Sequence, residues 1–157
     1  MTRAGIAAAP GARDVATAVN ALRAQGLRLS SARRVLLEVL YGAEQPISAE
    51  EIAAGGDRLP PSDLASVYRN LERLEELGLV RHVHLGHGPG RYLPTSSDRE
   101  FVVCDGCGAF VAVDPERLER ARDAVLEATG YEARFAHFPV VGTCAACRDL
   151  VAGARES

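Results

Sequence analysis

The 157-residue chain contains no lysine and no tryptophan, and it has one methionine and four cysteines. No hydrophobic run approaches the ~18 residues of a membrane-spanning helix, and the start of the chain lacks the pattern of a secretory signal. We therefore expect a soluble, cytoplasmic protein with no membrane partner. A hydrophobic fraction of 47% is enough for one core or two small ones.

In the absence of lysine, all 18 basic residues are arginines. Arginine forms bidentate pairs with phosphate or guanine, although uniform use of arginine can equally reflect genomic base composition. The net charge of −3 excludes a nonspecific nucleic-acid coat. Residues 1–95 contain 11 arginines and 10 acidic residues, whereas residues 96–157 contain 7 and 11. A DNA contact, if there is one, belongs to the first part.

The cysteines form two matched pairs, each with the spacing C-x-x-C. Such a pair lets two thiolates from one tight turn reach a common ion, and two pairs complete a closed tetrahedral site. Two disulfides are the alternative, which a reducing cytosol disfavours, and a redox dithiol would need one pair beside a βαβ pattern. We predict one structural Zn²⁺ per chain, held by Cys104, Cys107, Cys144 and Cys147. A closed zinc site is a fold element and names no function.

Apolar residues at helical spacing predict four helices in the first part of the chain, followed by two strands. The helices begin near Val15, at Ser30 or Ser31, at the capping box Ser48–Glu51 and at Ser62 or Asp63, and the strands are Leu79–Leu85 and Arg91–Leu93. Helices followed by a two-stranded ribbon suggest a winged helix-turn-helix, whose last helix enters the major groove of DNA.

The fourth helix carries Ser66, Arg69, Asn70 and Arg73 on its polar face, with Tyr68 at the edge. The alternative is an ordinary solvated face. The acidic residues that follow would repel phosphate, so only the first half of the helix can face DNA; they are Glu72, Glu75 and Glu76.

The second part of the chain reads as β-β-α-β with a cysteine pair at either end. After a linker at residues 94–97 we expect strands Phe101–Val103 and Phe110–Val113, a helix from Asp114 to Gly130, and a strand Ala133–Val141. Its core is small, and an unpaired sheet edge invites a second copy.

The predicted fold class is α+β, with an N-terminal winged helix-turn-helix and a small α/β dimerisation domain that carries a Cys₄ zinc site. The predicted divisions are a disordered tail (1–13), the winged-helix domain (14–94), the zinc-bound dimerisation domain (95–150) and a C-terminal tail (151–157).

The stretch Ser66-Val67-Tyr68-Arg69-Asn70-Leu71 resembles the (T/S)-V-Y-R-x-L signature of the ferric uptake regulator family. Leu27–Arg33 is similar to that family's L-R-x-T-x-x-R, and the cysteine pairs stand where the family places its structural zinc. The resemblance implies a homodimeric, metal-responsive transcription repressor that binds an inverted-repeat operator in double-stranded DNA. It places six DNA-contacting candidates: Tyr68, Arg69, Ser66 and Asn70 on the recognition helix, and Arg28 and Arg33 near backbone phosphate.

One stretch departs from the family pattern. Most members carry a histidine-rich H-H-H-D-H before the first cysteine pair, whereas this chain has Ser97-Asp98-Arg99-Glu100-Phe101. A ligand histidine that the family carries before the third helix is also missing, around Gln45-Pro46. We therefore expect the usual sensor site at the hinge to be dismantled.

Four histidines remain, and three of them suggest another metal site. His82 and His84 alternate on one strand, while His137 precedes the second cysteine pair, in segments that resemble the family's nickel-responsive branch. Three imidazoles suit a regulatory divalent metal, for which we consider Zn²⁺, Ni²⁺, Fe²⁺ or Mn²⁺. Further candidate ligands are the carboxylates of Glu119, Glu100 and Asp98. The alternative for His82 and His84 is a half-exposed strand face, and His87 in the glycine-rich turn is a wing-tip contact or a bystander.

These features predict a DNA-binding regulator of metal-homeostasis or oxidative-stress genes. A zinc-ribbon protein-interaction module, or a family member that has lost metal sensing, is the alternative. The chain is not expected to be an enzyme, since it offers no nucleophile–base pair, phosphate loop or H-E-x-x-H.

Overall fold

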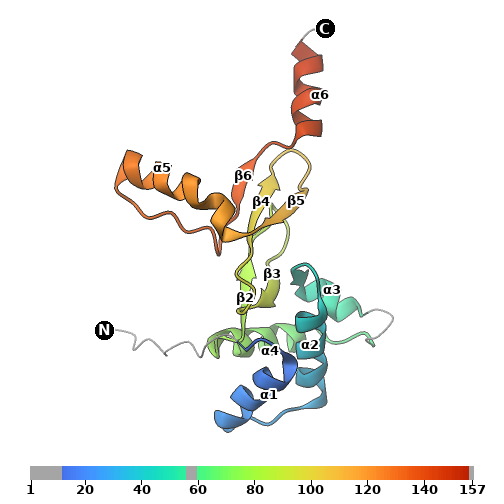
Figure 1. The fold of residues 1–157 in the computed structure, drawn as a ribbon. Helices are drawn as coiled ribbons and strands as arrows, with labels where there is room; N and C mark the ends of the chain where they lie inside the picture. The colour runs from blue at the N-terminus through green and yellow to red at the C-terminus, as the bar shows by residue number, and fades with distance from the viewer. Residues whose placement is uncertain (1–11, 56–59, 156–157) are drawn as a thin grey trace, which may run out of the picture. The chain divides into compact units, whose positions relative to one another are not determined.

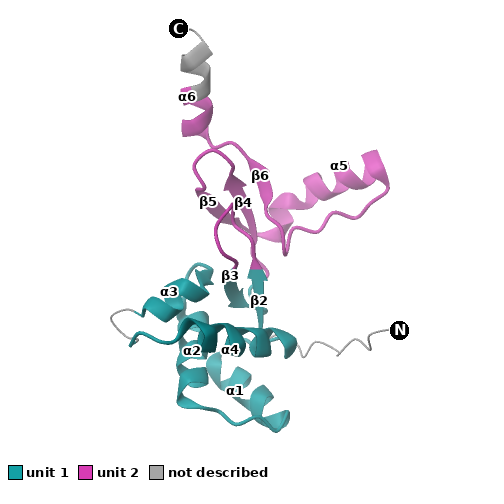
Figure 2. Cartoon of the chain, turned by 180° about the vertical axis from the view of Figure 1, so that it is seen from behind, with its two compact units in different colours: residues 1–82, 91–97 teal, residues 83–90, 98–157 magenta. Residues whose placement is uncertain are grey.

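The computed structural model describes residues 12–55 and 60–155, and the predicted N-terminal tail lies almost wholly outside them. The chain divides into two compact units, shown in different colours in Figure 2. The first contains the described residues up to His82 together with Arg91–Ser97, and the second contains Val83–Gly90 and the residues from Asp98 on. No helix in the described residues is long and apolar enough to cross a membrane.

The first unit consists of four helices and a small sheet (Figure 1). Its helices are α1 (Val15–Ala24), α2 (Ser31–Gly42), α3 (Ala49–Ala54) and α4 (Leu64–Glu76). Its strands are β1 (Ile47–Ser48), β2 (Val80–Val83) and β3 (Arg91–Pro94), in the order β1-β3-β2. Strand β1 pairs antiparallel with β3, so that Ile47 lies opposite Tyr92. This arrangement confirms the predicted winged helix-turn-helix; only the short β1 was not predicted.

Side-chain caps fix where the helices of this unit begin. Asp14, Ser30 and Asp63 each accept a hydrogen bond from a backbone amide three residues on, at 2.7, 3.2 and 2.8 Å respectively. Ser48 and Glu51 form the predicted capping box, with bonds of 3.1 and 2.9 Å. Such caps satisfy amides that have no partner within the helix.

A single apolar core holds the helices of the first unit together. The largest of its fully buried side chains come from α1, α2, α4 and the start of β2: Leu22, Leu37, Leu40, Leu71, Leu74, Leu79 and Val80. The helix residues among them lie on the apolar faces that helical spacing predicts, except for Leu37, which was not expected to face inward. The core fixes α4 against α2 and leaves the polar face of α4 to other contacts.

The second unit is a three-stranded sheet with two helices. Its elements are β4 (Glu100–Cys104), β5 (Phe110–Val113), the short 3₁₀ helix η1 (Pro115–Leu118), α5 (Glu119–Thr129), β6 (Val140–Gly142) and α6 (Ala145–Arg155). Strand β4 is central: it pairs antiparallel with β5 and parallel with β6.

Two predictions for the second unit are corrected. The predicted strand Ala133–Val141 is wrong over most of its length, since only Val140–Gly142 pairs with β4. Residues 131–139 have strand-like composition but form no strand in the structure, because a strand needs a continuous ladder of backbone hydrogen bonds to a neighbour. Helix α6 was not predicted, and it extends into what was expected to be a C-terminal tail.

Candidate functional site

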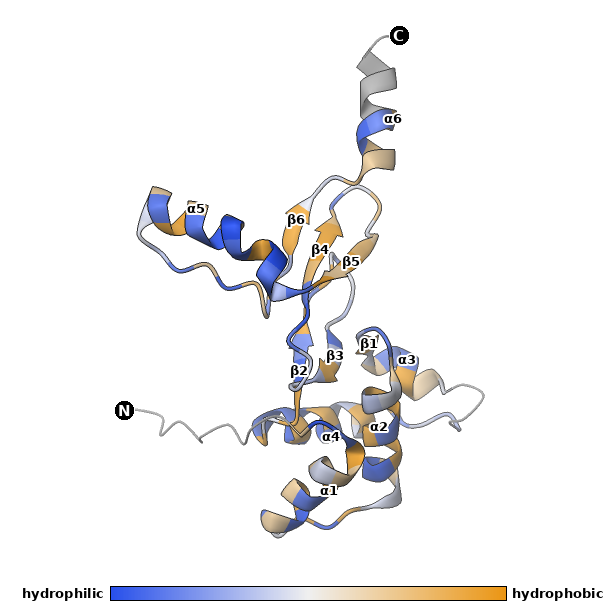
Figure 3. Cartoon of the chain, viewed as in Figure 1, coloured by the Kyte–Doolittle hydropathy of each residue, from blue (hydrophilic) through white to orange (hydrophobic). Residues whose placement is uncertain are grey.

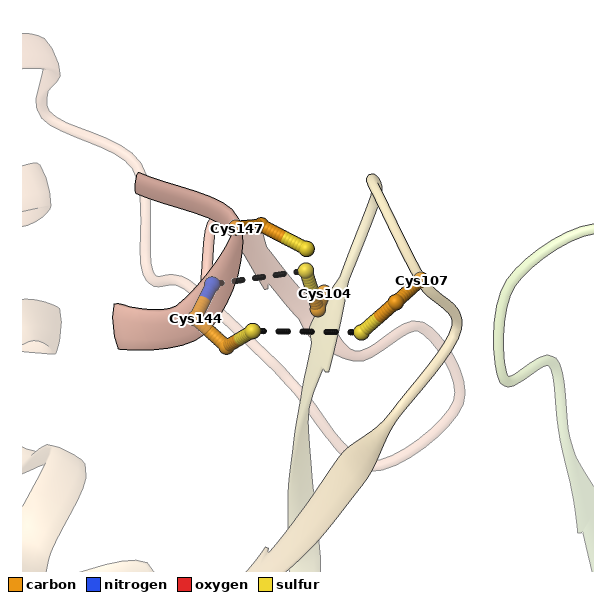
Figure 4. A group of neighbouring side chains, drawn as sticks. All are labelled: Cys104, Cys107, Cys144 and Cys147. Atoms are coloured by element: carbon orange, nitrogen blue, oxygen red, sulfur yellow. Dashed lines mark hydrogen bonds between the residues drawn. The ribbon is translucent and has the colours of Figure 1, made fainter. Parts of the chain in front are cut away.

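The four cysteines converge on one point at the end of β4 (Figure 4). Cys104 ends β4 and Cys107 follows in the tight turn to β5, while Cys144 and Cys147 lie at the start of α6. Their sulfur atoms all lie within 4.8 Å of one another, and those of Cys107 and Cys144 are 3.8 Å apart. A tetrahedron of sulfurs around zinc, at about 2.3 Å from the ion, has edges of about 3.8 Å. The donor set therefore fits a tetrahedral divalent ion.

The backbone around the thiols is shaped for close approach. A Cβ at Gly106 would lie only 3.1 Å from the sulfur of Cys147, so a residue with a side chain would push the two turns apart. The amide of Cys144 donates to the sulfur of Cys104 at 3.3 Å. This bond, with amides of the first turn, lowers the pKa of Cys104 to about 6.

The pKa of the Cys147 thiol is shifted in the direction opposite to that of Cys104. Hydrogen bonds to the sulfurs of Cys144, Cys104 and Cys107 raise the pKa of Cys147 to about 12. At neutral pH Cys104 is therefore mainly a thiolate, whereas Cys147 is protonated and would lose its proton on binding a metal ion. Metal binding at this centre consequently releases protons, and its affinity rises with pH.

The N-terminal half of α4 presents the residues expected to read DNA. Arg69 is 69% exposed, and within the described residues its ion pair is a long one, of 3.9 Å, with the equally exposed Asp63. Such surface pairs contribute about 0–1 kcal/mol, so little opposes a move of Arg69 toward another anion. The hydroxyl of Tyr68 donates to Glu50 at 2.7 Å, and this bond raises the pKa of Tyr68 and lowers that of Glu50.

The other four DNA-contacting candidates are linked to one another by hydrogen bonds inside the first unit. The guanidinium of Arg33 donates to the side chain of Asn70 at 3.2 Å and to the carbonyl of Arg28 at 2.8 Å. Asn70 in turn donates to the carbonyl of Ser66 at 2.9 Å. These bonds connect the start of α2 to α4. Arg33 and Asn70 therefore help to fix the orientation of α4.

Two of the candidate sensor histidines lie side by side in the second unit. The rings of His84 and His137 meet edge to face with their centroids 5.4 Å apart, and the amide of His84 donates to the carbonyl of His137 at 3.4 Å. The ring of Phe138 lies against both, at 6.0 Å from His84 and 4.5 Å from His137. Two imidazoles so close can offer nitrogen atoms to one ion.

The third histidine, His82, belongs to the first unit, near the end of β2. His82 and His84 alternate along the chain with the buried Val83 and Leu85, which is the pattern of side chains on one face of an extended segment. His82 Nδ1 lies 2.5 Å from the carboxylate of Glu75 on α4. This contact was not foreseen, because sequence reasoning had assigned Glu75 only a repulsive effect on phosphate.

Two of the candidate carboxylate ligands already have a cation between them. Arg122 on α5 donates to the buried Glu100 on β4 and, at 3.3 Å, to Glu119. It also donates to the carbonyl of Pro115 at 2.9 Å, and its charge lies 5.4 Å from the centre of the Phe135 ring. The carboxylates raise the pKa of Arg122, with Glu100 contributing most. The remaining candidate, Asp98, lies in the turn before β4, next to Arg99, which pairs with Asp114 at 3.4 Å.

The first unit is a winged helix-turn-helix, and the second is a small α/β unit with four converging thiols. Residues 24–138 match the model of the Ferric uptake regulator family, and the chain belongs to that family. Members of the family are transcription regulators and not enzymes, so this chain is a regulator.

The chain is 26% identical over 137 residues to the peroxide operon regulator of Bacillus subtilis, covering 87% of this chain and 94% of the relative. Among solved structures it is similar to the ferric uptake regulator of Pseudomonas aeruginosa with manganese, at 29% identity and a TM-score of 0.56, over 81% of this chain and 97% of that one. The ferric uptake regulator Fur of Helicobacter pylori, described with three functional metal-binding sites, shares the fold at 22% identity and a TM-score of 0.63, over 85% of this chain and 93% of that one.

The Arg122 cluster yields a prediction about stability. We expect Arg122→Gln to destabilise the protein by about 1–3 kcal/mol, because it leaves the buried carboxylate of Glu100 without its cation. The change is measured by thermal or urea unfolding of the purified protein. Arg134→Gln is the matched control: this arginine is 86% exposed and pairs loosely with Glu132 at 3.8 Å, so its loss should shift stability by less than about 0.5 kcal/mol. Equal unfolding curves for the two variants would show that the Arg122 pair contributes nothing.

Proposed function

We propose that this protein is a metal-responsive repressor that binds an inverted-repeat operator as a homodimer and controls metal-homeostasis or oxidative-stress genes. The observation that carries the proposal is the exposed N-terminal half of α4 on a winged helix-turn-helix, in a chain that belongs to the ferric uptake regulator family. The names of similar proteins support both metal-homeostasis and oxidative-stress genes, since the Bacillus subtilis relative is a peroxide operon regulator and the Pseudomonas aeruginosa protein is a ferric uptake regulator. An operator gel shift with and without added divalent metal tests it.

Failure of the purified protein to bind any inverted-repeat operator, with or without metal, would favour the alternative of a zinc-ribbon interaction module. Operator binding that ignores every divalent metal would instead indicate a family member that has lost sensing.

The proposed DNA contacts are supported by the partners that each side chain has in the structure. Tyr68 is the proposed contact to a base or methyl group, and Arg69 the proposed contact to phosphate or guanine. Their partners within the described residues, Glu50 and Asp63, are both exposed. Ser66 and Asn70 share the same part of the helix, and Arg28 and Arg33 lie at the entry of α2. We assign the Arg33–Asn70 bond a positioning role, with phosphate contacts from this pair as a second function.

Arg69→Ala tests the recognition helix. Operator binding should weaken by about 1–3 kcal/mol with relaxed specificity at one position if Arg69 pairs with a base. If Arg69 contacts only phosphate, the variant should lose the same affinity for every DNA sequence. The slope of the logarithm of affinity against the logarithm of salt concentration should then decrease by about one. The measurement is a set of binding isotherms on the operator and on single-base variants at several salt concentrations.

Arg73→Ala is the control for that experiment. Arg73 lies one turn further along α4 and pairs with Glu76 at 2.7 Å, within the acidic end of the helix. Its loss should change affinity less than the loss of Arg69. If neither variant changes operator binding, this face of α4 is an ordinary solvated face.

The homodimer is supported by apolar surface in the second unit. Helix α5 has no buried residue, and the strands of the unit are strongly apolar (Figure 3). Exposed large hydrophobic side chains gather in this unit: Val111, Val125, Leu126, Tyr131, Phe138, Val141 and Leu150. So much apolar surface on a small unit marks an interaction site, and a second copy of the chain is the occupant that the proposed repressor requires.

We propose that the thiol centre holds one structural Zn²⁺ per chain. Its closed set of four soft ligands leaves no position for substrate or exchangeable ligand, which is the arrangement of structural zinc. When bound, the ion would join the end of β4 to α6.

Cys104→Ser tests this zinc. The variant should contain about one zinc ion less per chain and should unfold at a lower temperature or lose its dimer, because metal binding at such a centre is coupled to folding. Elemental analysis, melting curves and sedimentation check the three effects. A variant that retains its zinc and its melting curve would rule out the Cys₄ centre.

We further propose that His82, His84 and His137 bind the regulatory divalent ion, with Zn²⁺, Ni²⁺, Fe²⁺ and Mn²⁺ as candidates. The neighbouring rings of His84 and His137 and the shared face of His82 and His84 support this set, and imidazole suits the first three of these ions best. An ion bound by ligands of both units would restrict their relative orientation, and with it the spacing of two recognition helices across half-sites about 34–36 Å apart. Glu100 and Glu119 are weaker candidates, because Arg122 engages both. Asp98 remains a candidate ligand.

His84→Ala and His137→Ala should each abolish metal-dependent operator binding while zinc content and dimerisation stay unchanged. Shifting a conformational equilibrium from 1:99 to 99:1 takes about 5.5 kcal/mol of differential metal binding, much of which a lost shared ligand would remove. His87→Ala, in the turn, is the control and should respond to metal normally. A normal response in both of the first two variants would exclude this site and direct attention to Asp98, Glu100 and Glu119.

A further inference from the structure

The last turn of α4 carries two adjacent carboxylates at an unfavourable place. The negative end of a helix dipole lies at the C-terminus, where acidic side chains are disfavoured unless another interaction offsets the cost. Glu76 has such an interaction in its ion pair with Arg73 at 2.7 Å. Glu75 has a different one: its Oε1 atom lies 2.5 Å from Nδ1 of His82.

The surroundings of His82 hold its ring in one orientation. The imidazole lies 6.0 Å, centroid to centroid, from the ring of Tyr92, which is only 9% exposed. Burial, followed by the nearby charge of Glu75, raises the pKa of Tyr92 to about 12, so its ring stays neutral beside the histidine. His82 itself is 29% exposed, which leaves part of its ring accessible to solvent. The carboxylate and the aromatic ring thus fix the histidine before any ion arrives.

The contact also selects a tautomer. An ionised carboxylate can only accept hydrogen bonds, so Nδ1 of His82 must carry the proton. In the neutral ring the lone pair then lies on Nε2, which is the atom free of the Glu75 bond and suited to a metal. Carboxylates that hold a metal-binding imidazole in this way fix its orientation and raise its basicity.

We propose that Glu75 is a positioning residue for the regulatory metal: it holds His82 as the Nδ1–H tautomer, presents Nε2 to the ion, and ties the ion to the recognition helix. This inference rests on the proposed metal site at His82, His84 and His137. Glu75 does not touch the ion in this scheme. It acts through His82, and it belongs to the same helix as Arg69, six residues away.

The test is a Co²⁺ titration of the full-length, zinc-loaded protein, followed by the visible absorption of the bound cobalt. Glu75→Ala should weaken Co²⁺ binding by about 10–100-fold, the usual effect of removing such a carboxylate. Glu75→Gln keeps a carbonyl oxygen that can accept from Nδ1, so its loss should be smaller. Glu76→Ala removes the same charge one position away and should bind Co²⁺ like the unaltered protein.

A second readout separates positioning from a merely structural ion pair. Nitrogen-15 chemical shifts of the protein with zinc at its cysteine centre and no added cobalt report the tautomer of His82, which should be Nδ1–H in the unaltered protein and in Glu75→Gln. In Glu75→Ala the ring should become a mixture of tautomers, whereas the melting temperature should match that of Glu76→Ala. A structural ion pair would change the melting temperature of Glu75→Ala and leave its cobalt affinity unaltered, and that result overturns the proposal.

The design distinguishes the two hypotheses. If His84→Ala loses the cobalt spectrum but Glu75→Ala binds with unaltered affinity, the metal site stands and the positioning role is overturned. If the unaltered protein binds no cobalt beyond its cysteine centre, the proposed metal site fails and the role of Glu75 is overturned with it.

Discussion

The convergence of four sulfur atoms at the end of β4 is the contact that brings the two ends of the second unit together. That strand supplies the few well-buried side chains of the sheet, Phe101 and Val103, and it ends at Cys104. The rest of the unit adds little to a hydrophobic core, because α5 has no buried residue and β6 is three residues long. A unit with so small a core needs a cross-link, and the thiols stand where one ion would join β4, the turn to β5 and α6. The first unit has no such need, since its own apolar core holds four helices together.

Helix α4 contacts the apolar core of the first unit, the residue expected to bind DNA and His82. Its apolar stripe of Val67, Leu71 and Leu74 packs into the core, and its first half exposes Arg69. Its last turn contacts His82 through Glu75. Because an α-helix rises 1.5 Å per residue, Arg69 and Glu75 are separated by about 9 Å along a rigid element. A change in the position of His82 therefore has a short mechanical path to the residue expected to contact DNA.

The sequence predicted those features that depend on local pattern. The cap of α4 at Asp63, the capping box at Ser48 and each of the two C-x-x-C pairs are encoded within a few residues, and the matching spacing of the pairs predicted that they converge. Contacts between side chains that no repeating sequence pattern links were not predicted. The spacing of Glu75 and His82, or of Glu100 and Arg122, does not indicate that these side chains are in contact.

The failure at residues 133–139 has a different cause. Alternating apolar and polar residues can favour a strand, but pairing decides whether one forms, and in the described residues only Val140–Gly142 joins the sheet. A single chain's sequence does not say which neighbour a sheet edge will find. This is also the stretch that leads to His137, so the segment least determined by local pattern is the one that carries a proposed ligand.

Arg122 changes what the carboxylates of the second unit can do. Glu100 and Glu119 sit on β4 and at the start of α5, and a divalent ion between them would link the same two elements that Arg122 links now. A guanidinium keeps its charge at any pH that proteins experience, and it cannot dissociate from the chain. The link between β4 and α5 through Arg122 therefore does not depend on metal, whereas a link through a metal ion would depend on the metal concentration.

The sequence Ser97–Phe101, which stands where the family pattern has a histidine-rich stretch, agrees with a link that needs no metal. A cross-link that never changes cannot report a change in metal concentration, so any response to metal must come from groups that exchange their ion, and imidazoles that can bind and release one are such groups.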